Sequence, residues 1–264
     1  MKPSLAFFSF AEITDPAKHH EFNEYHQLDH RPENLALPGV IFGERWVRSP
    51  ACAAAVPSPG TDFDAVQYMT MYWLREPVEA SRLEWLDLGT TATHLGRRPD
   101  LGWSRRPLVG AFVPLKGYVT PRVLISAEAL PFRPGRGLYV TVSRLGPDLA
   151  AAERLARFYD RVAIPDLLAC PGVTGAWTFV SESAFPAHRS PVADPGLGDL
   201  RIHVCFLDQD PVAFAAELAG RQAQWAAAGR VPDDPGAETP LFTAVLETIV
   251  PWQWGWFDRP AAGG

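Results

Sequence analysis

The chain has 264 residues, of which 47% are hydrophobic and 20% charged, values typical of a globular protein with an ordinary core. Its net charge is −6 at pH 7, and the sequence has no basic stripe, so we expect no nucleic-acid partner. No apolar run reaches the length of a membrane span, and no cleavage site follows the short apolar N-terminal stretch. We therefore expect no membrane partner and a cytoplasmic protein.

The three cysteines, Cys52, Cys170 and Cys205, include no CxxC pair. An odd number at this spacing predicts neither a disulfide framework nor a zinc knuckle. Cys205 lies in an apolar run and is expected to act as a small core residue.

The first predicted elements are a strand, a helix and a second strand. Residues 5–12 are rich in aromatic residues and predict a strand. Asp15 is a good N-cap and Pro16 is tolerated at the first helical position. Because Pro32 disfavours helical geometry in the residue before it, we expect this helix to end near His30.

The next elements follow a long loop. A Pro-, Gly- and Ser-rich loop of roughly twenty residues precedes the strand 66–74, and such loops are more often functional than structural. The Pro77-Val78 pair then opens a helix at its first turn.

The second half of the chain repeats this order. Residues 22–46 align without a gap on residues 155–179, at an offset of 133 residues. The matched positions include Pro32 with Pro165 and the Pro38-Gly39-Val40 turn with Pro171-Gly172-Val173. The strand 5–12 falls on residues 138–145 at the same offset. Such self-similarity indicates a repeated structural unit.

Each half reads strand, helix, strand, loop, strand, helix, strand, which is the βαββαβ ferredoxin-like pattern. We therefore predict an α+β fold of two tandem ferredoxin-like units that pair as an intramolecular dimeric α/β barrel. The units are residues 1–125 and 137–264, with a linker over residues 126–136.

Tyr25-His26, the His30-x-Pro32 sequence and the Pro38-Gly39-Val40 turn together resemble the EthD-like branch of the dimeric α/β-barrel superfamily. The resemblance covers residues 5–118 and 138–258. It implies a fused pseudo-dimer with sites between the sheet and the helices of each unit. Members of that family act on small hydrophobic or aromatic molecules, often by acid–base chemistry without a bound metal.

A comparison of the two halves separates residues of the fold from residues of a site. The reactive side chains that only the first half carries are His26, Asp29 and His30, which become Tyr159, Val162 and Ala163 in the second half. We therefore expect an active site in unit 1 and a degenerate one in unit 2.

Four residues of the first helix are the candidate catalytic residues. Histidine titrates near neutrality, so His30 is predicted to be the principal general acid/base, assisted by His26. Asp29 could orient one imidazole, and Tyr25 could donate a hydrogen bond to a developing oxyanion. The alternative is a solvated helix end at which the last histidine caps carbonyls.

Aromatic strand residues are the candidate lining of an apolar substrate pocket: Phe8, Phe10, Trp46, Tyr68, Tyr72 and, in the second half, Trp177. Core packing is the alternative for each of them. Arg45 could bind a substrate carboxylate through two hydrogen bonds, although exposed strand arginines are common.

Two cofactor readings stay open beside our expectation of no cofactor and no metal. His26 and His30 lie one helical turn apart, so zinc could bind them if Glu33 or His94 supplied a third ligand. His203, in the middle of a strand, could be a haem ligand, since some relatives of the superfamily bind haem.

The leading functional hypothesis is a cofactor-independent enzyme that acts on a small hydrophobic, aromatic or polyketide-like compound. Its reaction would be a decarboxylation, dehydration, cyclisation or isomerisation. One alternative is a non-catalytic ligand-binding barrel, and another is a haem- or metal-dependent oxidoreductase. The expected partners are the small substrate, the second unit of the same chain and, outside the internal pseudo-dimer, a further homo-dimer.

Overall fold

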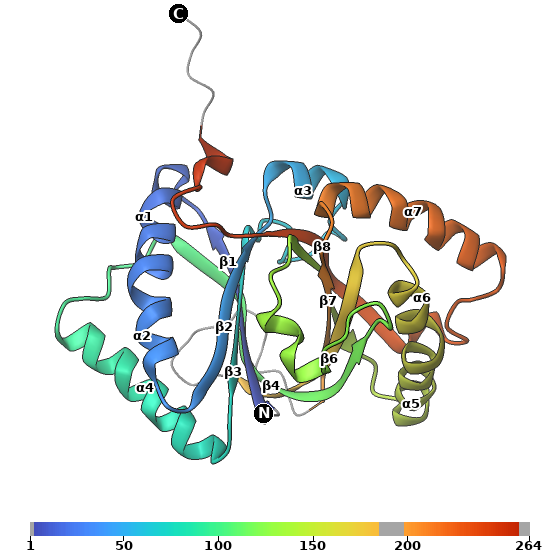
Figure 1. The fold of residues 1–264 in the computed structure, drawn as a ribbon, viewed down its shortest axis with the longest axis horizontal. Coiled ribbons are helices and arrows are strands. Elements are labelled where there is room, and N and C mark those ends of the chain that lie inside the picture. Colours follow the sequence, from blue (N-terminus) through green and yellow to red (C-terminus); the bar gives the residue numbers. More distant parts are fainter. Residues whose placement is uncertain (1–2, 185–197, 259–264) are drawn as a thin grey trace, which may run out of the picture.

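The structure is a computed structural model, and it describes residues 3–184 and 198–258. Eight antiparallel strands close into one barrel, and the helices pack on its outer surface (Figure 1). Around the barrel the order is β1-β3-β2-β8-β5-β7-β6-β4. The strands are β1 (Leu5–Ile13), β2 (Val40–Val47), β3 (Tyr68–Leu74), β4 (Ser104–Val119), β5 (Gly137–Leu145), β6 (Val173–Ala184), β7 (Leu200–Leu207) and β8 (Glu238–Thr248).

The helices are of three kinds. The α-helices are α1 (His19–Glu24), α2 (Arg31–Ala36), α3 (Pro50–Ala55), α4 (Val78–His94), α5 (Leu149–Phe158), α6 (Ile164–Leu168) and α7 (Pro211–Ala227). The π-helical segments are η2 (Tyr25–His30) and η4 (Tyr159–Ala163). The 3₁₀ turns are η1 (Pro16–Lys18), η3 (Ala127–Phe132), η5 (Pro235–Ala237) and η6 (Gly255–Phe257). Within the described residues, no helix is long and apolar enough to cross a membrane.

The barrel consists of two four-stranded halves that follow the same order. The first half runs β4-β1-β3-β2 and the second runs β8-β5-β7-β6. Helices α1, α2 and α4 of the first half cover one side of the barrel, and α5, α6 and α7 of the second half cover the opposite side, whereas α3 of the first half packs beside α7 (Figure 1). The α+β barrel of the dimeric α/β type, as predicted, is therefore present.

The pairing register relates the halves in detail. Val40 pairs with Leu74 and Val173 pairs with Leu207, so the strands β2 and β3 map on β6 and β7 at the offset of 133 residues. The first strand does not follow this offset, because Leu5 pairs with Leu74 whereas Gly137 pairs with Leu207. Our alignment of residues 5–12 with 138–145 is thus wrong by one residue, and a one-residue slip moves every side chain to the other face.

The two seams between the halves differ in length. Strands β4 and β6 pair from Gly110–Ala184 to Val119–Gly175, whereas β2 and β8 pair only at Trp46–Thr248 and Val47–Glu247. Barrel closure at the second seam therefore needs support from outside the ladder.

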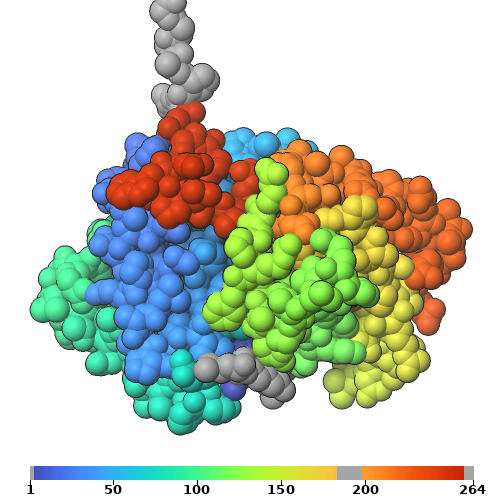
Figure 2. Space-filling view, in the orientation of Figure 1, coloured from blue at the N-terminus to red at the C-terminus, as the bar shows by residue number. Residues whose placement is uncertain are grey.

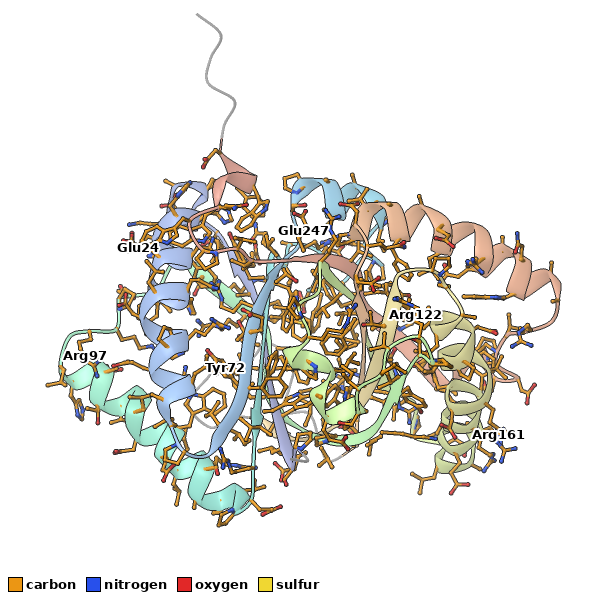
Figure 3. The ribbon with its side chains drawn as sticks, in the orientation of Figure 1. Glu24, Tyr72, Arg97, Arg122, Arg161 and Glu247 are labelled. Atoms are coloured by element: carbon orange, nitrogen blue, oxygen red, sulfur yellow. The ribbon has the colours of Figure 1, made fainter. Side chains whose placement is uncertain are left out.

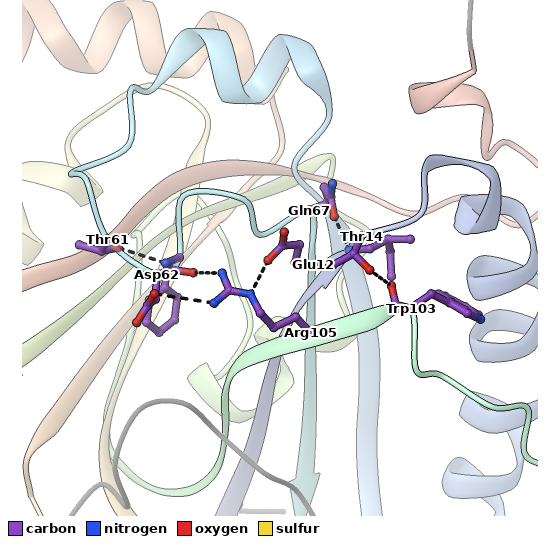
Figure 4. Close-up of polar contacts among 9 residues, drawn as sticks. Glu12, Thr14, Thr61, Asp62, Gln67, Trp103 and Arg105 are labelled. Carbon is purple, nitrogen blue, oxygen red and sulfur yellow. Dashed lines mark hydrogen bonds and ion pairs between the residues drawn. The ribbon is translucent and has the colours of Figure 1, made fainter.

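The segment after β2 supports this short seam. The Ser49 hydroxyl donates to the Glu247 carboxylate, and the Thr61 hydroxyl donates to the Leu241 carbonyl at 2.6 Å. Arg105 holds the same segment to the first half, since its Nε lies 2.6 Å from Glu12 Oε2 and its Nη2 lies 2.9 Å from the Asp62 carbonyl (Figure 4).

The interior of the barrel is a packed aromatic and aliphatic core to which both halves contribute. Phe8 contacts Phe112 and Phe179 in T-shaped arrangements at centroid distances of 5.3 and 5.0 Å. Phe63, from the loop after α3, and Leu130, from η3, belong to the same core. A closed eight-stranded sheet has an interior that side chains just fill, so this core leaves the outer faces as the place for ligands.

The first helix continues past the predicted end. It runs from His19 through the π-helical segment to Ala36, so the expected end near His30 is wrong. Proline clashes with the carbonyl of the residue four positions earlier, and it lacks an N–H group. Here the Arg31 N–H donates to the His26 carbonyl, five residues back, and the wider turn accommodates Pro32.

The C-terminal segment returns from β8 to the first half. His20 Nε2 lies 2.7 Å from Asp258 Oδ1, and the rings of His19 and Phe257 stack at 4.1 Å. In the space-filling view this segment lies across the N-terminal half of the molecule (Figure 2).

We expect closure of the barrel to be a property of one chain, because both seams are intramolecular. The urea midpoint should stay constant over a roughly hundredfold range of protein concentration, as mass action does not enter. Phe10→Ala, in the common core, should lower the free energy of unfolding by about 3–5 kcal/mol in one cooperative transition. A midpoint that rises with concentration, or separate transitions for the two halves, would contradict this prediction.

Candidate functional site

A cavity of about 270 Å³ lies in the first half of the chain, outside the barrel. It is bounded by the outer faces of β1, β3 and β4, by the helix η2 and by the helix α4. The residues that line it are Phe7, Ser9, Tyr25, His26, His30, Thr70, Tyr72, Trp85, Leu86, Gly89, Thr90, Thr93, His94, Arg98, Leu101 and Arg106. Its volume is just below the ~300–1,000 Å³ of pockets for drug-sized ligands, so it fits a small compound.

His26 is buried and held in one orientation. Its Nδ1 lies 2.8 Å from the Phe22 carbonyl. Because a carbonyl only accepts hydrogen bonds, Nδ1 carries the proton, and Nε2 is left with its lone pair. Burial, with the charges of Arg45, His30 and Arg106, lowers the pKa of His26 well below 6.5. At neutral pH this residue is therefore a neutral imidazole that can accept a proton or a hydrogen bond.

The π-helical segment brings Tyr25 and His30 to the same cavity. Their rings stack with centroids 5.5 Å apart, and the His26 ring meets the His30 ring edge-on at 5.5 Å. In a regular α-helix residues five apart point about 140° away from each other, whereas i→i+5 hydrogen bonding brings them to one face. Burial raises the pKa of Tyr25, so its hydroxyl stays a hydrogen-bond donor at neutral pH.

Two arginines give the cavity a positive charge. Arg98 follows α4 and Arg106 lies on β4, and no aspartate or glutamate is among the lining residues. Burial and the nearby Arg98 lower the pKa of Arg106 to about 10, which still leaves its guanidinium charged at neutral pH. Its Nε is buried without a hydrogen-bond partner. The site can therefore stabilise an anionic group of a ligand.

Aromatic side chains form the apolar wall. The Trp85 ring of α4 meets the rings of Phe7 and Tyr72 at 4.5 and 5.1 Å. Tyr72 lies between the strands and the first helix (Figure 3), where Asn34 approaches its hydroxyl. A Cβ atom at Gly43 would come within 2.3 Å of the Tyr72 ring, so glycine is required there for this ring position.

A buried polar layer supports the helix from below. The Arg45 side chain is completely buried, with Nη2 at 3.2 Å from Asn23 Oδ1 and its guanidinium 5.0 Å from the Phe22 ring. Asn23 and His19 both reach the Tyr68 hydroxyl at 2.9 Å. These contacts fix the helix on the sheet, and Arg45 is not among the residues that line the cavity.

The predicted site residues separate into three groups. Tyr25, His26, His30 and Tyr72 line the cavity together. Asp29 is exposed and does not line it, and Tyr68 is buried in the layer below. Three of the predicted pocket residues are instead in the barrel interior: Phe8, Phe10 and Trp46. Trp177 is in the interior as well.

Arg98, Arg106 and Trp85 were missed by sequence reasoning. Each comes from the second part of the first half, far from the helix motif in the sequence. The sequence signalled only that a helix follows Pro77, and the residues of that helix that face the cavity are not distinctive by type.

The zinc arrangement does not form. The described residues contain no group of three histidine, cysteine, aspartate or glutamate side chains that could hold a metal ion. Glu33, one of the two proposed third ligands, is ion-paired with Arg97, and the Nδ1 atom of His26 is taken by the Phe22 carbonyl.

Haem does not fit around His203 either. Both ring nitrogens of His203 are buried without a hydrogen-bond partner, so one of them is free for a metal, but the other lacks the acceptor that an axial histidine usually has. However, its ring stacks on Tyr159 at 4.2 Å, and the adjacent cavity has a volume of about 280 Å³. A tetrapyrrole belongs among ligands that occupy several hundred cubic ångströms, so this space is too small.

Solved structures share this fold. An anthrone oxidase-like protein superposes with a TM-score of 0.54 at 15% sequence identity, over 94% of this chain and 92% of that one. A dye-decolorizing peroxidase from Bacteroides thetaiotaomicron gives a TM-score of 0.50 at 8% identity, over 94% of both chains. No family model and no curated protein sequence matches the chain. These similarities show a shared fold, a closed barrel of the dimeric α/β type.

The neutral state of His26 predicts a pH dependence of stability. In the unfolded chain the pKa of His26 is near 6.5. Below that pH the unfolded state binds more protons than the folded state, so the free energy of unfolding decreases as the pH is lowered. His26→Gln keeps a donor for the Phe22 carbonyl but cannot titrate. We expect this variant to lose less stability than the wild type between about pH 7 and pH 5, by up to about 2 kcal/mol.

Urea unfolding at the two pH values measures this difference. The exposed His20, six residues earlier in the sequence, supplies the control variant His20→Gln. Equal losses in the wild type and in His26→Gln would show that folding does not lower the pKa of His26 and would contradict this prediction.

Proposed function

We propose that the protein is an enzyme that removes an acidic proton from a small aromatic or polyketide-like compound in the first-half cavity. The observation that carries this proposal is the orientation of His26, whose Nδ1–H is bound to the Phe22 carbonyl inside a cavity lined by two arginines and no carboxylate. The same cavity supports the small-molecule, histidine-based acid–base chemistry that the sequence predicted.

In this proposal His26 Nε2 is the general base. The pKa of His26 lies well below 6.5, which makes the neutral imidazole a weak base. Proton transfer is efficient only when the pKa values of donor and acceptor are not far apart. The substrate must therefore have an acidic proton, such as one on a carbon between two carbonyl groups, one on the methylene group of an anthrone, or one on a phenol.

The proton loss leaves an enolate or phenolate, and Arg98 and Arg106 are the groups that stabilise it. A guanidinium in a partly dry cavity is worth more to a developing anion than it would be in water. Tyr25 would donate a hydrogen bond to the same oxygen, since its raised pKa keeps the hydroxyl protonated. His30, stacked on Tyr25, would donate a proton at a second position of the substrate, which gives an isomerisation. The proton that His26 has taken up would then pass to His30, whose ring it meets edge-on, or to solvent, so that both residues return to their starting states. The same acid and base would suit decarboxylation, dehydration or cyclisation.

The walls of the cavity support an aromatic substrate. Phe7, Tyr72 and Trp85 offer ring faces and edges, and aromatic ligands pack favourably against such surfaces. The volume of about 270 Å³ restricts the ligand to a compact molecule.

Oxidation by dioxygen is a second candidate function. The carbanion formed by His26 is electron-rich and could pass electrons to dioxygen. The solved structure named as anthrone oxidase-like, which shares this fold, favours that outcome. Oxygen uptake during turnover distinguishes this oxidation from a simple isomerisation.

We infer further that the two halves arose by tandem duplication and that the chain belongs with the EthD-like branch. Support comes from the shared strand order, from the equal pairing registers of β2–β3 and β6–β7, and from the π-helical segment that each half carries before its proline.

Anthrone in deuterated buffer tests the proposed base, with exchange of its methylene protons followed by NMR under nitrogen. His26→Gln should slow exchange by roughly a hundredfold to ten-thousandfold relative to the wild type. His20→Gln, on the same helix but outside the cavity, should leave the rate unchanged. If anthrone binds but the wild type exchanges no faster than buffer, the protein is a ligand-binding barrel and the proposal fails.

Arg106→Gln tests the stabilisation of the anion. This variant should lower kcat by roughly ten- to a thousandfold with a smaller change in KM, because the full negative charge exists only after proton transfer. Arg97→Gln, which removes a charge outside the lining, is the matched control. A change confined to KM would mean that Arg106 only binds the ground state.

A further inference from the structure

A second cavity lies in the second half, on the outer face of the sheet beside the π-helical segment η4. It has a volume of about 280 Å³ and lies between the outer faces of β4, β6 and β7 and the helices α5 and η4. By strand register His203 takes the position of Thr70. At the offset of 133 residues Tyr159 takes the position of His26. The polar side chains of this cavity therefore differ from those of the first.

His203 enters this cavity from β7. Only 4% of the residue is exposed, and neither Nδ1 nor Nε2 has a hydrogen-bond partner. A buried polar group without a partner costs free energy of folding, and most such groups in proteins have one. Burial, with the charge of Arg201, lowers the pKa of His203 to about 3, so the ring is neutral and offers one donor and one acceptor.

Arg201 lies two residues earlier on the same face of β7. It is 8% exposed, and its Nη1 atom is buried without a partner. Among the described residues, no carboxylate lies within ion-pair distance of its guanidinium. Glu238 accepts a hydrogen bond from the Tyr159 hydroxyl instead. The cavity thus holds a cation and a neutral imidazole whose hydrogen-bonding capacity is unused.

Aromatic rings and aliphatic side chains form the apolar part of the cavity wall. Tyr159 lies flat against His203 at 4.2 Å, and Leu115 and Ala156 also line the space. The one acidic residue of the lining, Asp160, is already bound by Lys116 and by the Tyr118 hydroxyl. An anion that enters would therefore meet a carboxylate whose charge is compensated.

We propose that this cavity is a second binding site and that it takes a small aromatic carboxylate. The carboxylate would accept hydrogen bonds from Arg201, which suits its two oxygens. It would also accept one from an N–H of His203. The ring of the ligand would pack against Tyr159 and Leu115. The site needs no proton transfer, so it does not depend on the function of the first cavity.

Benzoate is the probe, and benzamide is its uncharged counterpart of the same shape. Calorimetric titration of the full chain should show saturable benzoate binding, with benzamide bound at least roughly tenfold more weakly. The titrations are carried out in the Arg106→Gln background as well, which removes a charge from the first cavity. Benzoate binding should survive there.

Arg201→Gln should weaken benzoate binding by roughly ten- to a hundredfold, whereas Arg161→Gln, an exposed charge outside the lining, should not change it. His203→Phe keeps an aromatic ring on Tyr159 and removes the two partnerless nitrogens. It should weaken binding while leaving the thermal midpoint equal to or above that of the wild type.

Three results would overturn the proposal: no saturable binding of benzoate, equal affinity for benzoate and benzamide, or binding lost in Arg106→Gln but kept in Arg201→Gln. Because none of these measurements uses turnover, a failure of this site is distinguishable from a failure of the proposed acid–base function.

Discussion

The packed interior of the barrel is the constraint on which the arrangement of sites depends. Phe8, Phe112 and Phe179, from β1, β4 and β6, meet edge to face and fill the space between the two halves. An eight-stranded barrel is narrow enough for side chains to occupy it fully. Ligands are then restricted to the outer face of each half-sheet, under the helix that covers it. Both described cavities that border β4 lie there, one on each side of the molecule.

A proline in the middle of each covering helix shapes those cavities. Pro32 and Pro165 follow a segment in which the backbone bonds five residues back, as at Arg31 N–H to the His26 carbonyl. The π-helical turn brings Tyr25 and His30 together in the first half. In the second half it carries Tyr159, whose ring stacks on His203. The histidine is thus on the helix in one half and on the strand in the other, while the backbone framework is shared.

Much of the fold could be predicted from the sequence, because strand patterns, helix caps and the repeated Pro-Gly-Val turn are local signals. The helix motif also indicated Tyr25, His26 and His30. The face on which each strand residue lies was less predictable, since a one-residue slip in register reverses it. Phe8, Phe10 and Trp46, which were candidate pocket residues, belong to the core instead. Arg106 could not be found, because its role depends on β4 lying beside β1, a contact between residues almost one hundred positions apart. The continuation of the helix beyond His30 was not predicted either, because proline was taken to end the helix.

The two halves of one chain are free to differ in a way that two identical chains are not. In a symmetric dimer both seams and both cavities would be the same, because each subunit presents the same surface. Here β4 pairs with β6 along a long ladder, while β2 and β8 share two residue pairs and depend on contacts such as that of Thr61 with the Leu241 carbonyl. Because different contacts hold the two seams, the two halves need not present the same surface. The second half has Tyr159 and His203 at the positions that His26 and Thr70 occupy in the first, so the two cavities present different polar groups to a ligand.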